Sequence, residues 1–117
     1  MFNDSCIFCK IIQGHIKSSI IKENDFVLAI ADIAPKAPVH ILLMPKKHIA
    51  SFADIQDDDT QYVWHLCKMA RDLGLEVCQG KGFNLIANNG ADAGQSVFHL
   101  HLHFLSGRNI FDGGTKL

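Results

Sequence analysis

Three histidines occupy every second position of one short segment, and this spacing is the clearest sign of chemistry in the chain. Segment 96–104 reads Ser-Val-Phe-His-Leu-His-Leu-His-Phe, with the histidines at His99, His101 and His103. Side chains of a β-strand point alternately to its two faces, so the three imidazoles are expected to share one face. The residues between and around them are apolar and are expected to share the other face, towards the core: Phe98, Leu100, Leu102 and Phe104.

Three imidazoles in a row are compatible with a metal centre or with nucleophilic catalysis. Neighbouring Cα atoms of the row would lie about 6.7 Å apart, and the outer two about 13 Å apart. Two neighbours can therefore meet on one ion, at N–metal distances of about 2.1 Å, whereas three in a row hardly can. Alternatively, one imidazole attacks an electrophile while the others bind and orient it, because imidazole is largely neutral near pH 7 and can carry a proton. A merely solvated sheet face is the third interpretation, which the strict repetition of histidine disfavours.

Two cysteines near the start of the chain form a second candidate site. Cys6 and Cys9 have the C-x-x-C spacing of metal ligands. A structural zinc would need two more ligands; without them the pair would be free thiols on a short helix. Cys67 and Cys78 are eleven positions apart, which is about 16 Å along a helix, so these two cannot share an ion. Cys67 falls in an apolar helical stripe and is expected to be buried.

Periodicity and turn residues predict the elements that must position these side chains. The order is helix, strands, helix, strands, which predicts an α+β fold with antiparallel strands and the long helix packed on one face of the sheet. The expected helices are 5–12, capped by Ser5, and a long helix that starts after the acidic residues 57–59 and ends before Gly80. The expected strands are 26–33, 40–44, 83–87 and 97–105.

Length and composition set the class of protein. The 117 residues are expected to form one domain over 1–117. Apolar residues are 48 % and charged residues 20 %, which argues against disorder. Eleven basic and twelve acidic residues leave a net charge of −1, which excludes bulk binding of nucleic acid. No apolar run approaches membrane-spanning length and no signal peptide is visible, so we expect a cytoplasmic protein without a membrane partner.

Several segments of the chain resemble a known family. The segment 99–105 is similar to the HφHφHφφ motif of the histidine triad (HIT) superfamily of nucleotide hydrolases and transferases, where φ is apolar. Five further collinear blocks resemble the Hint branch of that family: 6–12, 32–35, 37–40, 45–49 and 94–98. The resemblance therefore covers nearly the whole chain.

The resemblance implies a fold and an activity. The fold would be a five-stranded antiparallel sheet with two helices, continued across a homodimer into ten strands. The activity would be that of a purine nucleoside phosphoramidase, which cleaves the P–N bond of substrates such as adenosine 5′-monophosphoramidate. By position His101 would be the nucleophile and would form a nucleotidyl-histidine intermediate. His103 and His40 would lie around the α-phosphate, and Ser96 would bond to the phosphate or to the departing amine.

The resemblance also implies how the nucleotide is held. Asp32 would bind the ribose hydroxyls, with Ile33 and Asn88 nearby. The purine slot would be formed by five apolar residues: Ile7, Phe8, Ile11, Ile16 and Ile30. From spacing alone, Ile7, Phe8 and Ile30 would simply be core residues. Relatives often carry a Trp-Pro near the C-terminus, which is missing here, so their preference for particular leaving groups does not carry over.

Some bacterial relatives with a similar C-x-x-C bind a structural zinc. Their ligands correspond by position to four residues of this chain: Cys6, Cys9, His48 and His99. Such a zinc would take His99 out of the row while His101 and His103 act on the substrate. The chemistry itself would need no metal.

Two other classes of function remain open. One is a metal-dependent hydrolase with histidine ligands, which is weakened because no Asp or Glu follows the triad until Asp112. Loss of activity to a chelator and its recovery with metal would favour that class. The other is a nucleotide-binding or scaffold module with little turnover, which binding without hydrolysis would favour.

Overall fold

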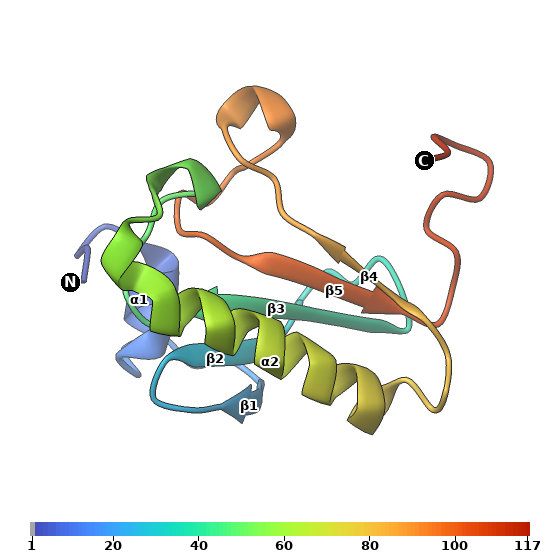
Figure 1. The fold of residues 1–117 in the computed structure, drawn as a ribbon, viewed down its shortest axis with the longest axis horizontal. Helices are drawn as coiled ribbons and strands as arrows, with labels where there is room; N and C mark the ends of the chain where they lie inside the picture. Colours follow the sequence, from blue (N-terminus) through green and yellow to red (C-terminus); the bar gives the residue numbers. More distant parts are fainter. Residues whose placement is uncertain (1) are drawn as a thin grey trace.

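A five-stranded antiparallel sheet forms the centre of the protein in a computed structural model that describes residues 2–117 (Figure 1). The strands lie in the order β1-β2-β3-β5-β4, so β1 and β4 are at the edges. The helices and strands in chain order are α1 (Ile7–Ile12), β1 (Ile20–Glu23), β2 (Val27–Ala31), β3 (Val39–Pro45), α2 (Thr60–Val77), β4 (Phe83–Ile86) and β5 (Leu102–Ser106). The expected α+β class, with one long and one short helix, is confirmed.

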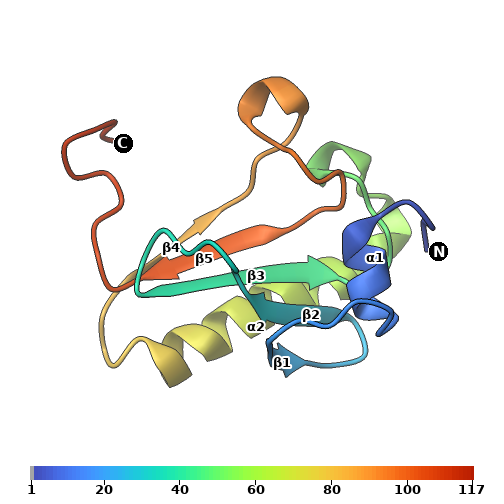
Figure 2. The same ribbon diagram turned by 180° about the vertical axis from the view of Figure 1, so that it is seen from behind.

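The two helices cover opposite faces of the sheet, and Figure 2 shows α1 on the near side with α2 beyond it. Residues of β3 alternate between the two faces, because successive side chains of a strand point in opposite directions. Ile41 and Leu43 pack with the apolar stripe of α2 in the larger core cluster. Leu42 and Met44 pack with α1 in a smaller cluster on the other face. His40 lies on this second face, which is therefore the face where a site can form.

The register between β3 and β5 brings two histidines together. Leu42 pairs with His103 and His40 pairs with Leu105, so the two histidines are diagonal neighbours on one face of the sheet. Because β3 and β5 are interior strands with partners on both sides, their backbones hold these side chains rigidly.

An ion pair between a buried carboxylate and a partly exposed lysine marks the start of α2. Asp59 ends a short 3-10 turn (Asp57–Asp59), is almost fully buried, and forms an ion pair with Lys47. The backbone N–H of Gln56 also donates to its carboxylate, at 2.9 Å. These bonds tie the start of the long helix to the segment that follows β3.

The structure corrects the expected strand over 97–105. β5 begins only at Leu102, and residues 97–99 form a bend. Extending the register of β3 and β5 places Pro45 opposite Leu100, and proline has no N–H to donate to a ladder. The N–H of Leu100 instead donates to the carbonyl of Ile49, at 2.6 Å. The expectation that Phe98 lies in the core is also wrong, because its side chain is 51 % exposed.

Other sequence-based expectations differ in detail. The first helix begins at Ile7, and its N-cap is Cys6, whose Sγ accepts from the N–H of Cys9. Edge strand β1 was not expected from the sequence, because it is short and largely exposed. Cys67 is exposed and not buried, since it lies about 100° round the helix from Leu66, which belongs to the apolar stripe that meets the sheet. Within residues 2–117, no helix combines the length and the apolar content that crossing a bilayer requires.

Candidate functional site

Asp32, His40 and His103 meet on the sheet face that carries α1. The Nε2 atom of His40 lies 2.9 Å from Nδ1 of His103 and 3.4 Å from a carboxylate oxygen of Asp32. Asp32 stands just after β2, where its other oxygen accepts from the N–H of Ala34, at 2.8 Å. His103, which is far from Asp32 and His40 in the sequence, thus joins them in one polar cluster.

Hydrogen bonds determine which ring nitrogens carry protons in this cluster. The backbone N–H of Lys36 donates to Nδ1 of His40, at 3.0 Å, so the ring proton of neutral His40 is on Nε2. That proton is donated to Nδ1 of His103, since the two atoms are in hydrogen-bond contact. The proton of neutral His103 is therefore on Nε2, where it is free to meet a ligand.

His101 has the opposite arrangement, with its free lone pair on Nε2. Its Nδ1 lies 2.7 Å from the backbone carbonyl oxygen of His99, so Nδ1 carries the proton and donates it there. The ring is partly buried and packs edge-on against Phe8, with centroids 5.0 Å apart. The rings of His101 and His103 are 5.1 Å apart. A nitrogen with a free lone pair and an N–H donor thus lie on neighbouring rings.

The surroundings keep His40 and His103 neutral near pH 7. Burial is the largest cause that lowers the pKa of both imidazoles below the ordinary histidine value. The positive charge of Lys36 lowers the pKa of both further, while Asp32 partly opposes the shift. The hydrogen-bond chain described above requires these neutral rings.

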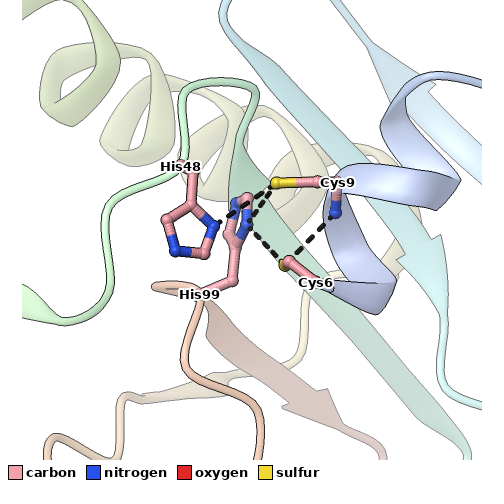
Figure 3. A group of neighbouring side chains, drawn as sticks. All are labelled: Cys6, Cys9, His48 and His99. Carbon is pink, nitrogen blue, oxygen red and sulfur yellow. Dashed lines mark hydrogen bonds between the residues drawn. The ribbon is translucent and has the colours of Figure 1, made fainter. Parts of the chain in front are cut away.

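A second cluster contains Cys6, Cys9, His48 and His99, as Figure 3 shows. Cys6 and Cys9 come from the start of α1, His48 follows β3, and His99 belongs to the bend before β5. Nδ1 of His99 lies 3.3 Å from Sγ of Cys6 and 3.6 Å from Sγ of Cys9. Nδ1 of His48 lies 3.3 Å from Sγ of Cys9. The four side chains belong to distant parts of the sequence and point towards a common centre.

The donor set fits a tetrahedral zinc ion. Zn–S bonds of about 2.3 Å and Zn–N bonds of about 2.1 Å would place sulfur and nitrogen ligands about 3.6 Å apart, close to the distances found here. His99 Nε2 donates to the carbonyl oxygen of Pro45, at 2.8 Å, which leaves Nδ1 as the lone pair facing the sulfurs. Burial lowers the pKa of His99 to about 4, so the ring is neutral as a ligand must be. Burial raises the pKa of the Cys9 thiol, and a cation between the sulfurs would favour its thiolate.

Asp32, His40 and His103 are also close enough to share an ion, but their hydrogen bonds oppose it. A neutral His40 that accepts from Lys36 through Nδ1 has its proton on Nε2, the atom that would have to bind the metal. The two facing nitrogens are hydrogen-bonded to each other, as a donor and an acceptor, and are not two lone pairs. In this arrangement the hydrogen bonds fix the tautomers of both rings and leave no lone pair on Nε2 of His40 for an ion.

A cavity of about 350 Å³ lies beside His40 and His103. Of the residues expected to hold the ribose and the phosphate, Asp32 and Asn88 line it as well. Ile33 does not, because its side chain is 99 % exposed. Sequence reasoning had singled out neither of two cationic lining residues, Lys36 and Arg108, because nothing in the sequence shows that these distant positions meet.

The other expected binding residues are not gathered in that cavity. Ser96 and Ile7 line a separate cavity of about 330 Å³, next to His48 and Cys6. Phe8 and Ile30 are buried in the core cluster under α1, and Ile11 packs against it. Ile7 and Ile16 are exposed. The five residues of the expected purine slot thus lie partly in the core and partly at the surface around α1.

Known proteins are similar to this chain in both sequence and fold. A family model described as "HIT domain" matches residues 13–110. A HIT-like protein of Synechocystis is 43 % identical over 105 residues, which cover 90 % of this chain and 92 % of the relative. A solved HIT family hydrolase from Clostridium thermocellum is 42 % identical with a TM-score of 0.89, and 98 % of each chain is covered. A histidine triad protein from Clostridium difficile is 44 % identical with a TM-score of 0.86, over 93 % of this chain and 96 % of that one.

Proposed function

The chain belongs to the HIT domain family, and from this membership we propose that it is a purine nucleoside phosphoramidase. It would hydrolyse the P–N bond of adenosine 5′-monophosphoramidate and related substrates. The observation that carries the proposal is the pair of fixed tautomers, with a lone pair on Nε2 of His101 beside an N–H on Nε2 of His103. Such a pair supplies a nucleophile and a donor for the charged oxygens of a phosphoryl group.

The reaction has two steps. In the first, Nε2 of His101 attacks phosphorus, the P–N bond breaks, and the departing nitrogen takes up a proton from solvent. In the second, water attacks phosphorus, the bond between phosphorus and Nε2 breaks, and the nucleoside monophosphate leaves while water gives up a proton to solvent. While phosphorus is bound, the imidazole ring is positive, and the bond from Nδ1–H to the carbonyl of His99 stabilises that charge.

The remaining residues have supporting roles in this proposal. His103 donates its Nε2–H to a phosphoryl oxygen, and His40 keeps that proton in place. Asp32 accepts hydrogen bonds from the ribose hydroxyls, and Asn88 lies in the same cavity. The hydroxyl of Ser96 is assigned to the phosphate or to the departing nitrogen. The purine is assigned to the apolar residues around α1, of which Ile7 and Ile16 are the exposed ones.

The test is the intact mass of the protein after brief mixing with adenosine 5′-monophosphoramidate, quenched under conditions that preserve phosphohistidine bonds. The wild-type protein is expected to show a transient adenylyl adduct and to release ammonia. His101→Ala is expected to show neither, while still binding AMP. His15→Ala removes an exposed histidine and serves as the control. An adduct that survives in His101→Ala would contradict the assignment of the nucleophile, and AMP binding without any turnover would indicate a binding module.

We also propose that the cluster of Cys6, Cys9, His48 and His99 holds a structural zinc ion. All four ligands come from the protein, which is typical of structural sites, whereas catalytic zinc keeps a position open for water or substrate. The metal would join α1 to the segments that flank β3 and β5, and no step of the reaction passes through it.

A homodimer is proposed through the edge of the sheet formed by β4. Within residues 2–117 this strand pairs with β5 alone, and its Phe83 and Leu85 are exposed. Two large apolar residues of α2, Trp64 and Leu75, are exposed as well. An exposed edge strand with apolar side chains is a template for pairing with a second chain. Light scattering is expected to give the mass of a dimer for the wild type and that of a monomer for Leu85→Lys, whereas Ile33→Lys is expected to stay dimeric.

A further inference from the structure

The sulfur atoms of Cys6 and Cys9 lie close together, and neither cysteine is in a disulfide. Their Sγ atoms are no more than 4.8 Å apart, and Figure 3 shows both of them facing the ring of His99. Cys6 is the N-cap of α1 and Cys9 follows three positions later, so helical geometry puts their Cα atoms about 5 Å apart. Disulfides join Cα atoms that are about 4.4–6.8 Å apart. The backbone therefore permits a bond between these two sulfurs.

The two thiols differ in how they can be reached from solvent. Cys6 is 9 % exposed and lines the cavity of about 330 Å³ beside Ser96 and His48. Cys9 is 0 % exposed and does not line this cavity, and its Sγ faces the rings of His48 and His99. One water molecule takes up about 30 Å³, so the cavity has room for a molecule as small as hydrogen peroxide. Such an oxidant would meet the sulfur of Cys6 first.

The other two cysteines are not placed to replace Cys9 as the partner of Cys6. Cys78 is buried in the larger core cluster, which lies on the face of the sheet opposite to α1. Cys67 is exposed on α2, which covers that same opposite face. Within one chain, an oxidised Cys6 is therefore expected to react with Cys9, whose sulfur is already beside it.

We propose that Cys6 and Cys9 form a redox site, at which hydrogen peroxide converts the two thiols into a disulfide that does not hold zinc. In the first step Sγ of Cys6 attacks the peroxide, the S–O bond forms, the O–O bond breaks, and the departing oxygen leaves as water with the proton of Cys6. In the second step Sγ of Cys9 attacks Sγ of Cys6, the S–S bond forms, the S–O bond breaks, and the oxygen leaves as water with the proton of Cys9. Two thiols are thus oxidised while one peroxide is reduced to two waters.

Oxidation and metal binding are alternatives for the same two sulfur atoms. The thiolate is the form of cysteine that binds metal, and a disulfide contains none. His48 and His99 alone would remain as ligands, whereas a closed structural zinc site uses four. In the zinc-loaded protein the sulfurs are already thiolates, so two protons from solvent complete the two waters and Zn²⁺ leaves to solvent. This inference rests on the zinc site proposed above and is independent of the phosphoramidase activity.

The test is peptide mapping of the zinc-loaded protein after treatment with increasing amounts of hydrogen peroxide. Cleavage after lysine and arginine leaves Cys6 and Cys9 together on residues 1–10, with Cys67 on residues 48–68 and Cys78 on residues 72–81. We expect an internal disulfide in the peptide 1–10. A chromogenic chelator is expected to detect one zinc ion released for each disulfide formed. Reduction with dithiothreitol in the presence of Zn²⁺ is expected to restore both thiols and the metal.

The order of attack is tested with two variants and a sulfenic-acid probe. Cys9→Ser leaves Cys6 without a partner, so a 1,3-dicarbonyl reagent is expected to label a sulfenic acid on Cys6. Cys6→Ser leaves the fully buried Cys9, which is expected to take up little label. Label on Cys9 equal to that on Cys6 would overturn the assignment of Cys6 as the sulfur that is attacked first.

Cys67→Ser is the matched control, because it removes an exposed thiol far from α1 and is expected to release zinc at the same peroxide concentration as the wild type. A zinc-containing protein whose peptide 1–10 keeps both thiols, while Cys67 is oxidised, would overturn the inference and leave the metal site intact. A protein that purifies without zinc and does not take it up would refute the metal site itself, and with it the exchange of metal for a disulfide.

Discussion

The Nδ1–H of His101 donates to the backbone carbonyl oxygen of His99 across 2.7 Å, so the residue that completes the cysteine–histidine cluster also orients the proposed nucleophile. The His99 ring is fully buried and its Nε2–H is bonded to Pro45. A ring fixed at both nitrogens leaves its own backbone little freedom. The proposed zinc site and the proposed catalytic site are thus joined through a single residue.

The first prediction concerns the metal. The wild-type protein is expected to contain one zinc per chain by elemental analysis, and Cys9→Ser to contain little. Removal of the metal by a chelator is expected to lower Tm by about 10 °C, which corresponds to about 2 kcal/mol for a domain of this size. Cys67→Ser changes an exposed cysteine and is expected to keep both the zinc and the Tm. A wild-type protein that purifies without zinc and does not take it up would refute the metal site.

The second prediction concerns His40, which keeps the proton of His103 on Nε2. His40→Leu removes that hydrogen bond and is expected to lower kcat at least tenfold, because His103 is then free to change tautomer. His40→Gln keeps an N–H donor and is expected to retain more of the activity. Steady-state kinetics of both variants measures this difference. An equal loss of kcat in the two variants would mean that the His40 side chain acts by packing alone.

The third prediction concerns the pH dependence of kcat/KM. Protonating Nδ1 of His103 would break its bond from His40, and burial lowers the pKa of His103 below 6.5. The loss of activity that follows protonation of His103 is therefore expected only below pH 6.5. Lys36→Met removes a positive charge that lowers the same pKa, so the decline is expected to begin at a higher pH in this variant. A shift to lower pH would contradict the assignment.

The fourth prediction concerns stability and the ion pair of Asp59 with Lys47 at the start of α2. Asp59→Asn leaves Lys47 without its partner, and because the Asp59 side chain is almost fully buried the variant is expected to be less stable than the wild type at pH 7. The bond to Lys47 lowers the pKa of Asp59 below its ordinary value of 3.8, so its contribution is complete above pH 3.8 and is lost as the pH falls through the folded-state pKa. Urea titrations across pH, with the exposed Asp58→Asn as control, measure this difference. A variant as stable as the wild type at pH 7 would refute it.

Much of the site could be predicted from local sequence. The alternation around Leu102 correctly places His101 and His103 on the face away from the α2 core. In a strand, side chains at odd and even positions point to opposite faces. The C-x-x-C spacing correctly brings Cys6 and Cys9 to one side of the first helical turn, because that spacing is nearly one turn. The α+β class likewise follows from the order in which helix-like and strand-like patterns of apolar residues occur along the chain.

Other features depend on contacts between distant segments, and the residue pattern of a single segment does not predict such contacts. The same alternation fails at Phe98, because β5 begins only at Leu102 and the bend before it leaves the Phe98 ring exposed. The His99 ring stays on the α1 side of the sheet, where it faces the cysteines. Lys36 and Arg108 are 72 positions apart, and only the folding of the loop after β2 against the chain after β5 places both in one cavity. The sequence by itself thus determined which residue types could do chemistry and on which face two of them lie. The tertiary structure decided their protonation and their partners, because hydrogen bonds and buried charges form between whichever groups the fold brings together.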